Sequence, residues 1–371
     1  LEELSPPALA LAGLPFEEQP AVILRDFGGN RLNLSGSIVT ASIERDSTTR
    51  MVSQKKILRS SSTVSKIVHF RVNKKEYLFV ANMFNGVSYN INSTLYAWNS
   101  TSEAMIEIQQ ISTQGAQHGK YFMHDGNHYL VVSNGFQEVT NIDGQIEGTY
   151  NTHSSIYRMD KISEKLVHFA SIPTKGAKSI ETMRIANHTM ILVSNSYDDS
   201  TVEVNSELYR FNPYGKPYLI LLQQVPTVAA YLFHYFKGPE GEDMVFFAQH
   251  FDVTASTYIA DSVLYRLREG QLVENPQSDK VRTSGVVAVK SFYAGSRRYV
   301  VVGNRYGTRN VSDAGGAVVY EFVKGNLILR QELTGLVGLT DMEYFHFNGA
   351  EWLVITTDPA LAGSNSPGKI T

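Results

Sequence analysis

The sequence predicts an all-β protein, a seven-bladed β-propeller of four-stranded antiparallel blades, and three repeated phrases lead to that prediction. The first phrase is an apolar strand that ends in a small residue, a polar residue and, two positions on, an aromatic residue. Its five clear copies are YLFVANMF, YLVVSNGF, MILVSNSY, MVFFAQHF and YVVVGNRY, which begin at Tyr77, Tyr129, Met190, Met244 and Tyr299. One strand phrase used repeatedly indicates a chain built from one supersecondary unit.

Two further phrases repeat out of step with the first. One reads SxLY or a close variant, and its tyrosines are Tyr96, Tyr157, Tyr209, Tyr265 and Tyr320. The other is a threonine followed by small residues, as in TQGA from Thr113 and TKGA from Thr174. Each cycle of roughly 55 residues then holds four short strands without helical periodicity, which describes one propeller blade. Such blades stack in a ring, because a single blade cannot bury both of its faces.

The two ends of the chain complete the count of blades. Residues 21–34 align without gaps on residues 67–80, which predicts a first blade, whereas the last blade, from Thr340, has only two clear strands. We expect the apolar run at residues 8–14 to supply the missing outer strand, so that pairing of the two ends closes the ring and leaves no exposed sheet edge. The chain is then one domain, 1–371, with a closing strand and lead-in at 1–20 and blades at 21–64, 65–116, 117–177, 178–230, 231–286, 287–339 and 340–371.

Composition excludes several classes of protein. The 371 residues carry a formal net charge of −3, so nothing favours a nucleic-acid partner. No apolar run approaches the roughly 18 residues of a membrane span, and we expect no membrane insertion. Cysteine is absent, which excludes disulfides, thiolate metal sites and a cysteine nucleophile. The absence of cysteine does not decide the compartment, because a large self-closing fold needs no disulfides outside the cell.

The motifs together resemble the EAR repeat, also called the epilepsy-associated or EPTP repeat. The resemblance is carried by YFMHDGNHYLVVSN from Tyr121, YFHFNGAEWLVITT from Tyr344, the SxLY strand and the QIST–GA junction, and it covers about residues 21–357. WD40 dipeptides and in-register kelch glycine doublets are missing. The resemblance implies a secreted, extracellular seven-bladed propeller that binds cell-surface receptors, as in the leucine-rich glioma-inactivated proteins. The sequence shows no leucine-rich repeats, so the receptor specificity of those proteins does not carry over.

The loops between the second and third strands are long, as at 135–153 and 250–261, whereas the turns between the first and second strands are short. We therefore expect one loop-rich face, and loops on a rigid scaffold commonly carry function. Its acids are Glu138, Asp143, Glu147, Asp198, Asp199, Glu203, Asp252, Asp261, Asp313 and Asp358, against two basic residues, Arg305 and Arg309. This face is predicted to bind a basic partner or cations; the alternative is that its acids only serve turns, which asparagine and aspartate favour.

Two functions follow for the loop-rich face. The first is an extracellular recognition module for a cell-surface receptor or matrix protein. The second is a glycan-binding propeller, a lectin, in which the aromatic residues that recur after the first phrase would form sugar platforms. Those aromatic residues are Phe136, Phe251 and Tyr306.

A ring of polar residues is expected around the central channel. Its members are Lys66, Lys120, Glu181, His234, Lys290 and Asp341, five of them seven residues after a junction threonine. Mixed signs of charge favour a structural ring of compensating charges, and a ligand or ion site is the alternative. We expect no cofactor and no metal site; a cation such as calcium in the channel or loops stays an open alternative.

The sequence contains no local catalytic motif, neither HExxH nor GxSxG nor a P-loop, and we therefore expect the chain not to be an enzyme. Secretion, which the resemblance implies, predicts N-glycosylation at sequons outside the blade core. Those sequons are at Asn92, Asn99, Asn187 and Asn310. A fifth, at Asn33, falls inside a predicted strand and is expected last.

Overall fold

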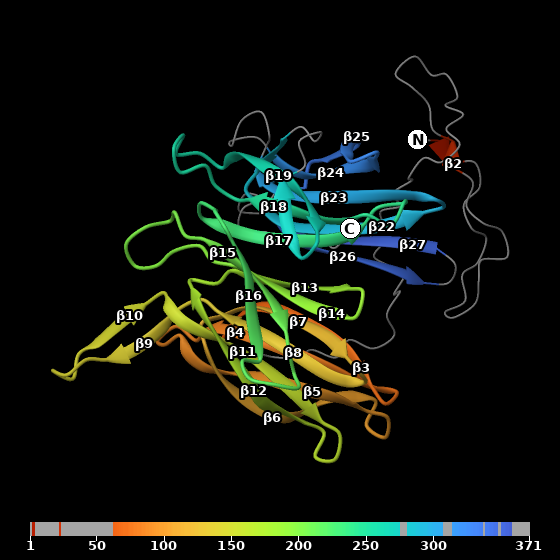
Figure 1. Ribbon diagram of the computed structural model, residues 1–371. Coiled ribbons are helices and arrows are strands. Elements are labelled where there is room, and N and C mark those ends of the chain that lie inside the picture. The colour runs from red at the N-terminus through yellow and green to blue at the C-terminus, as the bar shows by residue number, and fades with distance from the viewer. Residues whose placement is uncertain are drawn as a thin grey trace.

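The computed structural model describes residues 2–3, 22–23, 62–274, 280–306, 314–336, 338–347 and 350–357. Every regular element among them is a β-strand and all strand pairs are antiparallel, so the predicted all-β class is confirmed (Figure 1). The described part contains no helix that is long and apolar enough to cross a membrane.

Sheets whose strands pair in chain order recur along the molecule. The first consists of β3 (Thr63–Val72), β4 (Lys75–Phe84), β5 (Asn90–Asn99) and β6 (Ala104–Gln114). The second consists of β7 (Ala116–His124), β8 (Asn127–Asn134), β11 (Asn151–Asp160) and β12 (Lys165–Lys175). The third consists of β13 (Ser179–Ile185), β14 (His188–Ser194), β15 (Ser206–Phe211) and β16 (Leu219–Val225).

The later sheets vary this plan. In the fourth, β17 (Ala230–Lys237), β18 (Asp243–Gln249) and β19 (Ile259–Arg268) are followed by two short strands on β19, namely β20 (Gln271–Glu274) and β21 (Val281–Ser284). The fifth consists of β22 (Val286–Ala294), β23 (Arg297–Tyr306), β24 (Ala314–Val323) and β25 (Asn326–Thr334). The hairpins are β26 (Leu339–Phe347) with β27 (Ala350–Thr357), and β9 (Gln137–Thr140) with β10 (Ile146–Thr149).

The first strand of each sheet contacts the first strand of the next, in the order β3, β7, β13, β17, β22 and β26. Figure 1 shows β7, β13 and β17 toward the middle of the molecule and β6, β12 and β25 toward its outside. The arrangement is propeller-like. The expected closing run at residues 8–14 and nearly all of the expected first blade lie outside the described residues; β1 (Glu2–Glu3) and β2 (Val22–Ile23) pair with each other.

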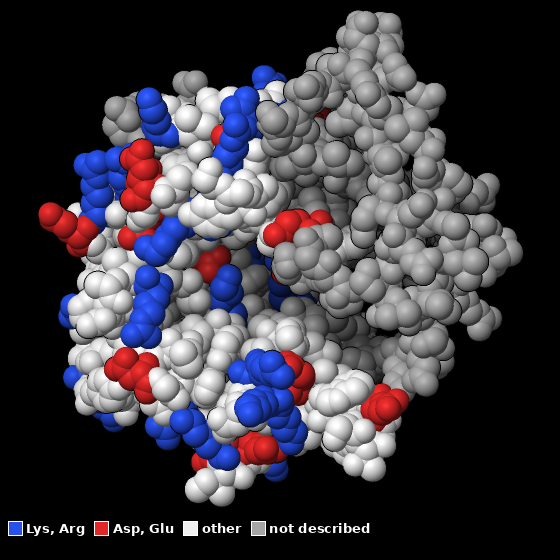
Figure 2. Space-filling model, turned by 90° about the vertical axis from the view of Figure 1, so that its right-hand side faces the viewer, with Lys and Arg blue, Asp and Glu red and all other residues white. Residues whose placement is uncertain are grey.

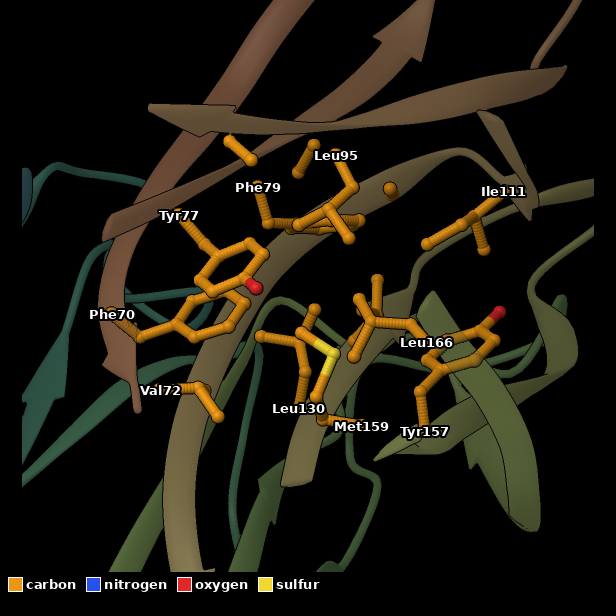
Figure 3. Packing of buried hydrophobic residues seen from close by; sticks show 14 residues of the cluster. Phe70, Val72, Tyr77, Phe79, Leu95, Ile111, Leu130, Tyr157, Met159 and Leu166 are labelled. Atoms are coloured by element: carbon orange, nitrogen blue, oxygen red, sulfur yellow. The ribbon is translucent and has the colours of Figure 1, made fainter. Parts of the chain in front are cut away.

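The hydrophobic core lies between the sheets. Each of five buried clusters draws on two successive sheets. In the cluster of Figure 3, Phe70 and Tyr77 from the first sheet stack with ring centroids 5.4 Å apart, and Leu130 and Met159 approach them from the second sheet. Truncating one such buried side chain to alanine typically costs about 3–5 kcal/mol. Packing between sheets therefore sets their mutual orientation.

The polar residue that ends each first phrase locks one sheet onto the next. Asn134 donates from Nδ2 to the carbonyl of His153 (2.7 Å) and accepts from the N–H of Gln114 in the preceding sheet (3.2 Å). Asn195 accepts the N–H of Lys175 in the same way (3.0 Å). Equivalent bonds to backbone are made by Asn82 and Asn304. The repeated asparagine is thus a structural residue, because a short amide side chain can satisfy backbone groups at a strand end.

Candidate functional site

The long connection between β8 and β11 forms the hairpin β9–β10, which projects from one side of the molecule (Figure 1). Its start is fastened to the first sheet by Glu138. The Ser88 hydroxyl donates to the Glu138 carboxylate (2.5 Å), and the N–H of Tyr89 donates to its other oxygen (3.2 Å). The Asn90 side chain donates to the carbonyl of Glu138 (2.7 Å) and accepts from its N–H (3.2 Å). Two loops of neighbouring sheets are thereby held together.

The same brace recurs one sheet further on, at Asp199. Its carboxylate accepts hydrogen bonds from the Thr149 hydroxyl (2.5 Å), the N–H of Tyr150 (2.7 Å) and the Asn151 side chain (2.7 Å). Desolvation acts to raise the pKa of Asp199, but these hydrogen bonds outweigh it and lower the pKa. Sequence reasoning missed the brace, although a signal was present: a Ser/Thr-Tyr-Asn triplet precedes an acid that lies 49 residues after the tyrosine in both cases.

Aromatic side chains form a second set of contacts between the same loops. Ring centroids lie 4.5 Å apart for Phe84 and Tyr89, 4.8 Å for Tyr89 and Phe136, and 4.8 Å for Phe136 and Tyr150. Tyr150 continues the row to Tyr197 (4.9 Å). Tilted and edge-on pairs at this spacing add stability beyond buried area. The row rigidifies the loops of three sheets.

The other two recurring aromatic residues meet on Tyr258. Its ring centroid lies 5.1 Å from that of Phe251 and 4.4 Å from that of Tyr306. The predicted platform residues Phe136, Phe251 and Tyr306 are therefore half-buried and pack on tyrosines of their own or an adjacent loop. Their recurrence is explained by loop bracing.

The remaining loop acids divide into bonded and unbonded groups. Hydrogen bonds from Ser200 and Thr201 lower the pKa of Asp198 to about 2. Glu147 accepts from the Asn141 side chain (2.7 Å), and Asp252 accepts from the N–H of Ala255 (2.9 Å). Within the described ranges, exposed carboxylates without a partner are those of Asp143, Glu203 and Asp261. Asp313, Asp358 and Arg309 lie outside the described residues.

The hairpin β9–β10 presents apolar side chains to solvent. Val139 is 41% exposed, Ile146 is 73% exposed, and Ile142 in the turn is fully exposed. Phe136 lies against the backbone of Gly148, where an added Cβ would come within 2.0 Å of the Phe136 ring. Only glycine fits there. The hairpin is thus anchored at its base by the aromatic row and apolar toward its tip.

A β-bulge near the start of the first strands determines which side chains face the channel. The bulged residues are Ser65, Gln117, Tyr231, Val287 and Thr340. Four of the predicted ring residues pair with the third position of the first phrase and so share one level: Lys120, Glu181, His234 and Lys290. Lys66 and Asp341 lie one level nearer the loop-rich face, so the expected single ring occupies two levels.

Glu343 is the residue of the last hairpin that shares the level of Lys290, and sequence reasoning missed it. The segment from Thr334 to Leu339 is two residues longer than the equivalent segment from Thr113 to Ala116. Counting seven residues from the threonine therefore ends at Asp341, two residues before Glu343. The paired position of Glu343, opposite the third residue of WLVITT, is the signal that locates it.

Charge pairs link the first strands around the channel. Nζ–carboxylate distances are 2.8 Å for Lys120 and Glu181, 2.6 Å for Lys290 and Glu343, and 2.8 Å for Lys66 and Asp341. The last pair joins β3 to β26, the first strand of the first described four-stranded sheet and that of the last hairpin. His234 donates or accepts at Ser291 Oγ (2.9 Å), and its other ring nitrogen lies 3.9 Å from Glu181. Seen from the side opposite the hairpin β9–β10, acidic and basic side chains surround a hollow (Figure 2).

Burial keeps two channel histidines neutral. Desolvation first, and then the neighbouring lysine charges, hold the pKa of His118 and of His234 well below the usual range. In the part of the chain that the structure describes, no three His, Asp or Glu side chains gather as metal ligands. The centre of the molecule therefore holds ion-paired lysines beside neutral histidines.

Three of the five sequons lie within the described residues, and they differ in their surroundings. Asn187 is exposed in the β13–β14 turn, as predicted. Asn92 is exposed but lies within β5 and not in a loop. Asn99 ends β5, half-buried, and accepts the N–H groups of Thr101 and Ser102. Asn33 and Asn310 lie outside the described residues.

Comparison with known proteins finds relatives that have an EAR repeat in their name, and no model of a protein family matches the chain. The thrombospondin-type laminin G domain and EAR repeat-containing protein of Homo sapiens is 30% identical over 226 residues, which is 48% of this chain and 34% of that protein. Its Mus musculus counterpart is 30% identical over 141 residues, 38% of this chain and 20% of that protein. The chain spans a fifth to a third of these relatives, whose name supports the EAR-repeat resemblance.

Solved structures similar to the chain include a family of glycoside hydrolases. They are RS223 β-xylosidase (TM-score 0.38, 11% identity, 64% of this chain and 85% of that one), a thermostable family-43 glycoside hydrolase (0.41, 10%, 73% and 94%) and a GH43 enzyme of Xanthomonas citri complexed with xylose (0.38, 13%, 66% and 81%). With TM-scores below 0.5 and identities of 10–13%, these structures assign no function to the chain.

These structures correct one expectation. The chain was expected not to be an enzyme because local catalytic motifs are missing, yet structures that resemble it are enzymes. An active site can be assembled from separate strands without a local motif. The missing motifs therefore do not exclude enzymatic activity, and the substrates of these enzymes are not inferred for this chain.

Proposed function

We propose that this chain acts outside the cell as a recognition module that binds a receptor or matrix protein through its loop-rich face. The observation that carries the proposal is the rigid hairpin β9–β10, which holds Val139, Ile142 and Ile146 in solvent on a braced base. Exposed apolar side chains on a prearranged surface favour protein binding, because little ordering entropy is lost on association.

The location rests on the relatives. Their name joins EAR repeats to thrombospondin-type and laminin G modules, which supports an extracellular setting. Exposed sequons at Asn92 and Asn187 are compatible with it. Protein expressed through the secretory pathway should lose mass on glycosidase treatment. An unchanged intact mass would argue against secretion.

We further propose that the module is a single domain of seven blades closed by its N-terminal run. The pair Lys66–Asp341 brings β3 and β26 together across 275 residues of sequence, which supports a ring, and nearly all of the first blade expected between them lies outside the described residues. Deleting residues 1–20 should remove an edge pairing and lower stability by several kcal/mol. A melting temperature equal to that of the intact chain would contradict closure by this segment.

The test of binding compares two equally exposed isoleucines. Ile142 lies in the β9–β10 turn and is fully exposed, and Ile162 lies in the β11–β12 turn at the other end of β11 and is 96% exposed. Proteins captured from intact cells by the wild-type chain should be lost with Ile142→Asp and kept with Ile162→Asp. Equal capture by both variants would show that the loop-rich face is not the interface.

A glycan array run in parallel distinguishes the lectin alternative. Specific sugar binding that is lost when Phe136 or Tyr306 is changed would favour it. The mutual packing of these aromatic residues argues for the protein partner, because their ring faces are occupied by other side chains.

A further inference from the structure

At the loop-rich end of the channel lie two cations, Lys178 and Arg305, that form no ion pair with any carboxylate in the described part of the chain. Lys178 directly precedes β13, and its N–H donates to the carbonyl of Ser194 (2.9 Å). Arg305 in β23 donates from its N–H to the Gly285 carbonyl (3.1 Å) and weakly from Nε to the Leu339 carbonyl (3.5 Å). Among the described residues, no carboxylate lies within ion-pair distance of either side chain. The lysines deeper in the channel each have one.

A stacked pair of rings belongs to the sheet between those that carry Lys178 and Arg305. Tyr231, the bulged residue of β17, stacks on His250 with ring centroids 4.5 Å apart and planes at 20°. His250 Nδ1 is engaged with the Val286 carbonyl (2.8 Å), which leaves Nε2 directed elsewhere. His250 and Arg305 bind the adjacent backbone carbonyls of Val286 and Gly285, and Lys178 directly precedes β13, the strand that contacts β17. Burial lowers the pKa of His250, and the charges of Arg305 and Lys178 lower it further. Two cations, the Tyr231 hydroxyl and the neutral His250 imidazole, drawn from three successive sheets, thus lie in one region.

The energetics of this cluster call for an anion. Burial lowers the pKa of Lys178, which means that the fold bears a desolvation cost for its charge without an internal partner. A β-bulge such as that at Tyr231 re-aims a side chain and commonly accompanies a binding site. A carboxylate placed between an ammonium and a guanidinium forms charge-assisted hydrogen bonds, which are the strong ones.

We propose that the loop-rich mouth of the channel binds a single carboxylate, that of an aspartate or glutamate side chain of the partner protein, between Lys178 and Arg305. This deepens the proposed function and rests on it. The exposed acids Asp143, Glu203 and Asp261 on the same face repel a polyanion, whereas they accept a segment in which one acid is flanked by basic residues. The partner's contact segment is therefore basic with one acidic residue at its centre.

The direct test titrates the full chain with the peptide acetyl-Lys-Gly-Glu-Gly-Lys-amide and with its glutamine counterpart. The glutamate peptide should shift the NMR signals of His250 at a concentration at least about ten-fold lower than the glutamine peptide, since about 1.4 kcal/mol of charge-assisted bonding corresponds to ten-fold. Lys178→Met and Arg305→Met should abolish the difference. The matched control is Lys175→Met, because Lys175 already pairs with Asp198 (3.4 Å). This variant should retain the difference between the two peptides.

Several outcomes overturn the proposal. One is an equal NMR response to both peptides, and another is an undiminished difference between the two peptides in Lys178→Met. The third is tighter binding of a hyaluronan oligosaccharide than of the glutamate peptide, which would show that the bound carboxylate is that of a sugar. Captured partner protein separates this inference from the proposed function. If capture survives both methionine variants but fails with Ile142→Asp, the carboxylate site falls while the recognition face stands. If the wild-type chain captures nothing, the recognition proposal falls and the peptide difference alone decides whether the mouth binds a carboxylate.

Discussion

The ring and the loop-rich mouth of the central channel differ in how their positive charges are compensated. In the ring, Lys120 and Lys290 each have a carboxylate oxygen within 2.8 Å. At the loop-rich mouth, Lys178 and Arg305 have none in the described part of the chain. Because an unpaired charge near the protein interior costs stability, the ion pairs of the ring serve the fold, and the mouth is where the proposed carboxylate would gain most. On that proposal, the difference separates structural charge from ligand-binding charge within one channel.

Removing the most buried carboxylate of the ring should have the largest effect. Glu181 is buried, and Glu181→Gln leaves the Lys120 ammonium and His234 facing an uncharged group, which should lower the free energy of unfolding by about 3 kcal/mol. Chemical denaturation measures it. The matched change Glu343→Gln affects a carboxylate that is 65% exposed and should cost less than about 1 kcal/mol. Equal losses would remove the distinction between the two carboxylates.

Breaking a loop brace should have an intermediate effect. Asp199→Ala removes the acceptor for Thr149, the Tyr150 N–H and Asn151, and should cost about 1–2 kcal/mol because the brace is largely exposed. Hydrogen exchange should accelerate in the loop 196–205 before the sheets are affected. Asp143→Ala, which removes an unpartnered acid, serves as the control and should change neither measurement. A loop that stays protected in Asp199→Ala would contradict the bracing role.

Lowering the pH should destabilise the folded protein through His118 and His234. The folded-state pKa of His118 and of His234 is depressed, so below pH 6.5 the unfolded chain binds protons that the folded chain does not. Stability should therefore fall progressively as the pH drops below 6.5 toward the folded pKa values. Denaturation between pH 7 and pH 5 measures the slope, and the double variant His118→Gln, His234→Gln should flatten it. An unchanged slope in that variant would assign the acid sensitivity to other groups.

The smallest expected effect on stability is a slight stabilisation. Lys178→Met removes an uncompensated charge while keeping the length of the side chain, so the melting temperature should stay level or rise by a few degrees. Lys120→Met, by contrast, leaves Glu181 buried without its cation and should lower it. A clear loss of stability in Lys178→Met would show that this lysine has a structural partner and would remove the basis of the comparison.

Local patterns predicted the fold well and the site only in part. Strand alternation, tight turns and the recurring asparagine are short-range signals, and the sheets between β3 and β25 follow them. Register around the channel is a non-local property, and two extra residues before Leu339 were enough to place Asp341 where Glu343 lies. The role of Phe136 escaped for the same reason, because its partners Tyr89 and Tyr150 belong to separate loops. The unpaired state of Lys178 is likewise visible only once its surroundings are known.

Hydrogen-exchange mass spectrometry of the chain with and without its captured partner protein tests the central claim most directly. If the loop-rich face is the recognition surface, protection on binding should concentrate in the hairpin at 137–149, in the loop 196–205 and around Lys178, while the turns at 73–74, 125–126 and 161–164 on the opposite side exchange as before. Protection confined to those opposite turns, with the hairpin unchanged, would contradict it.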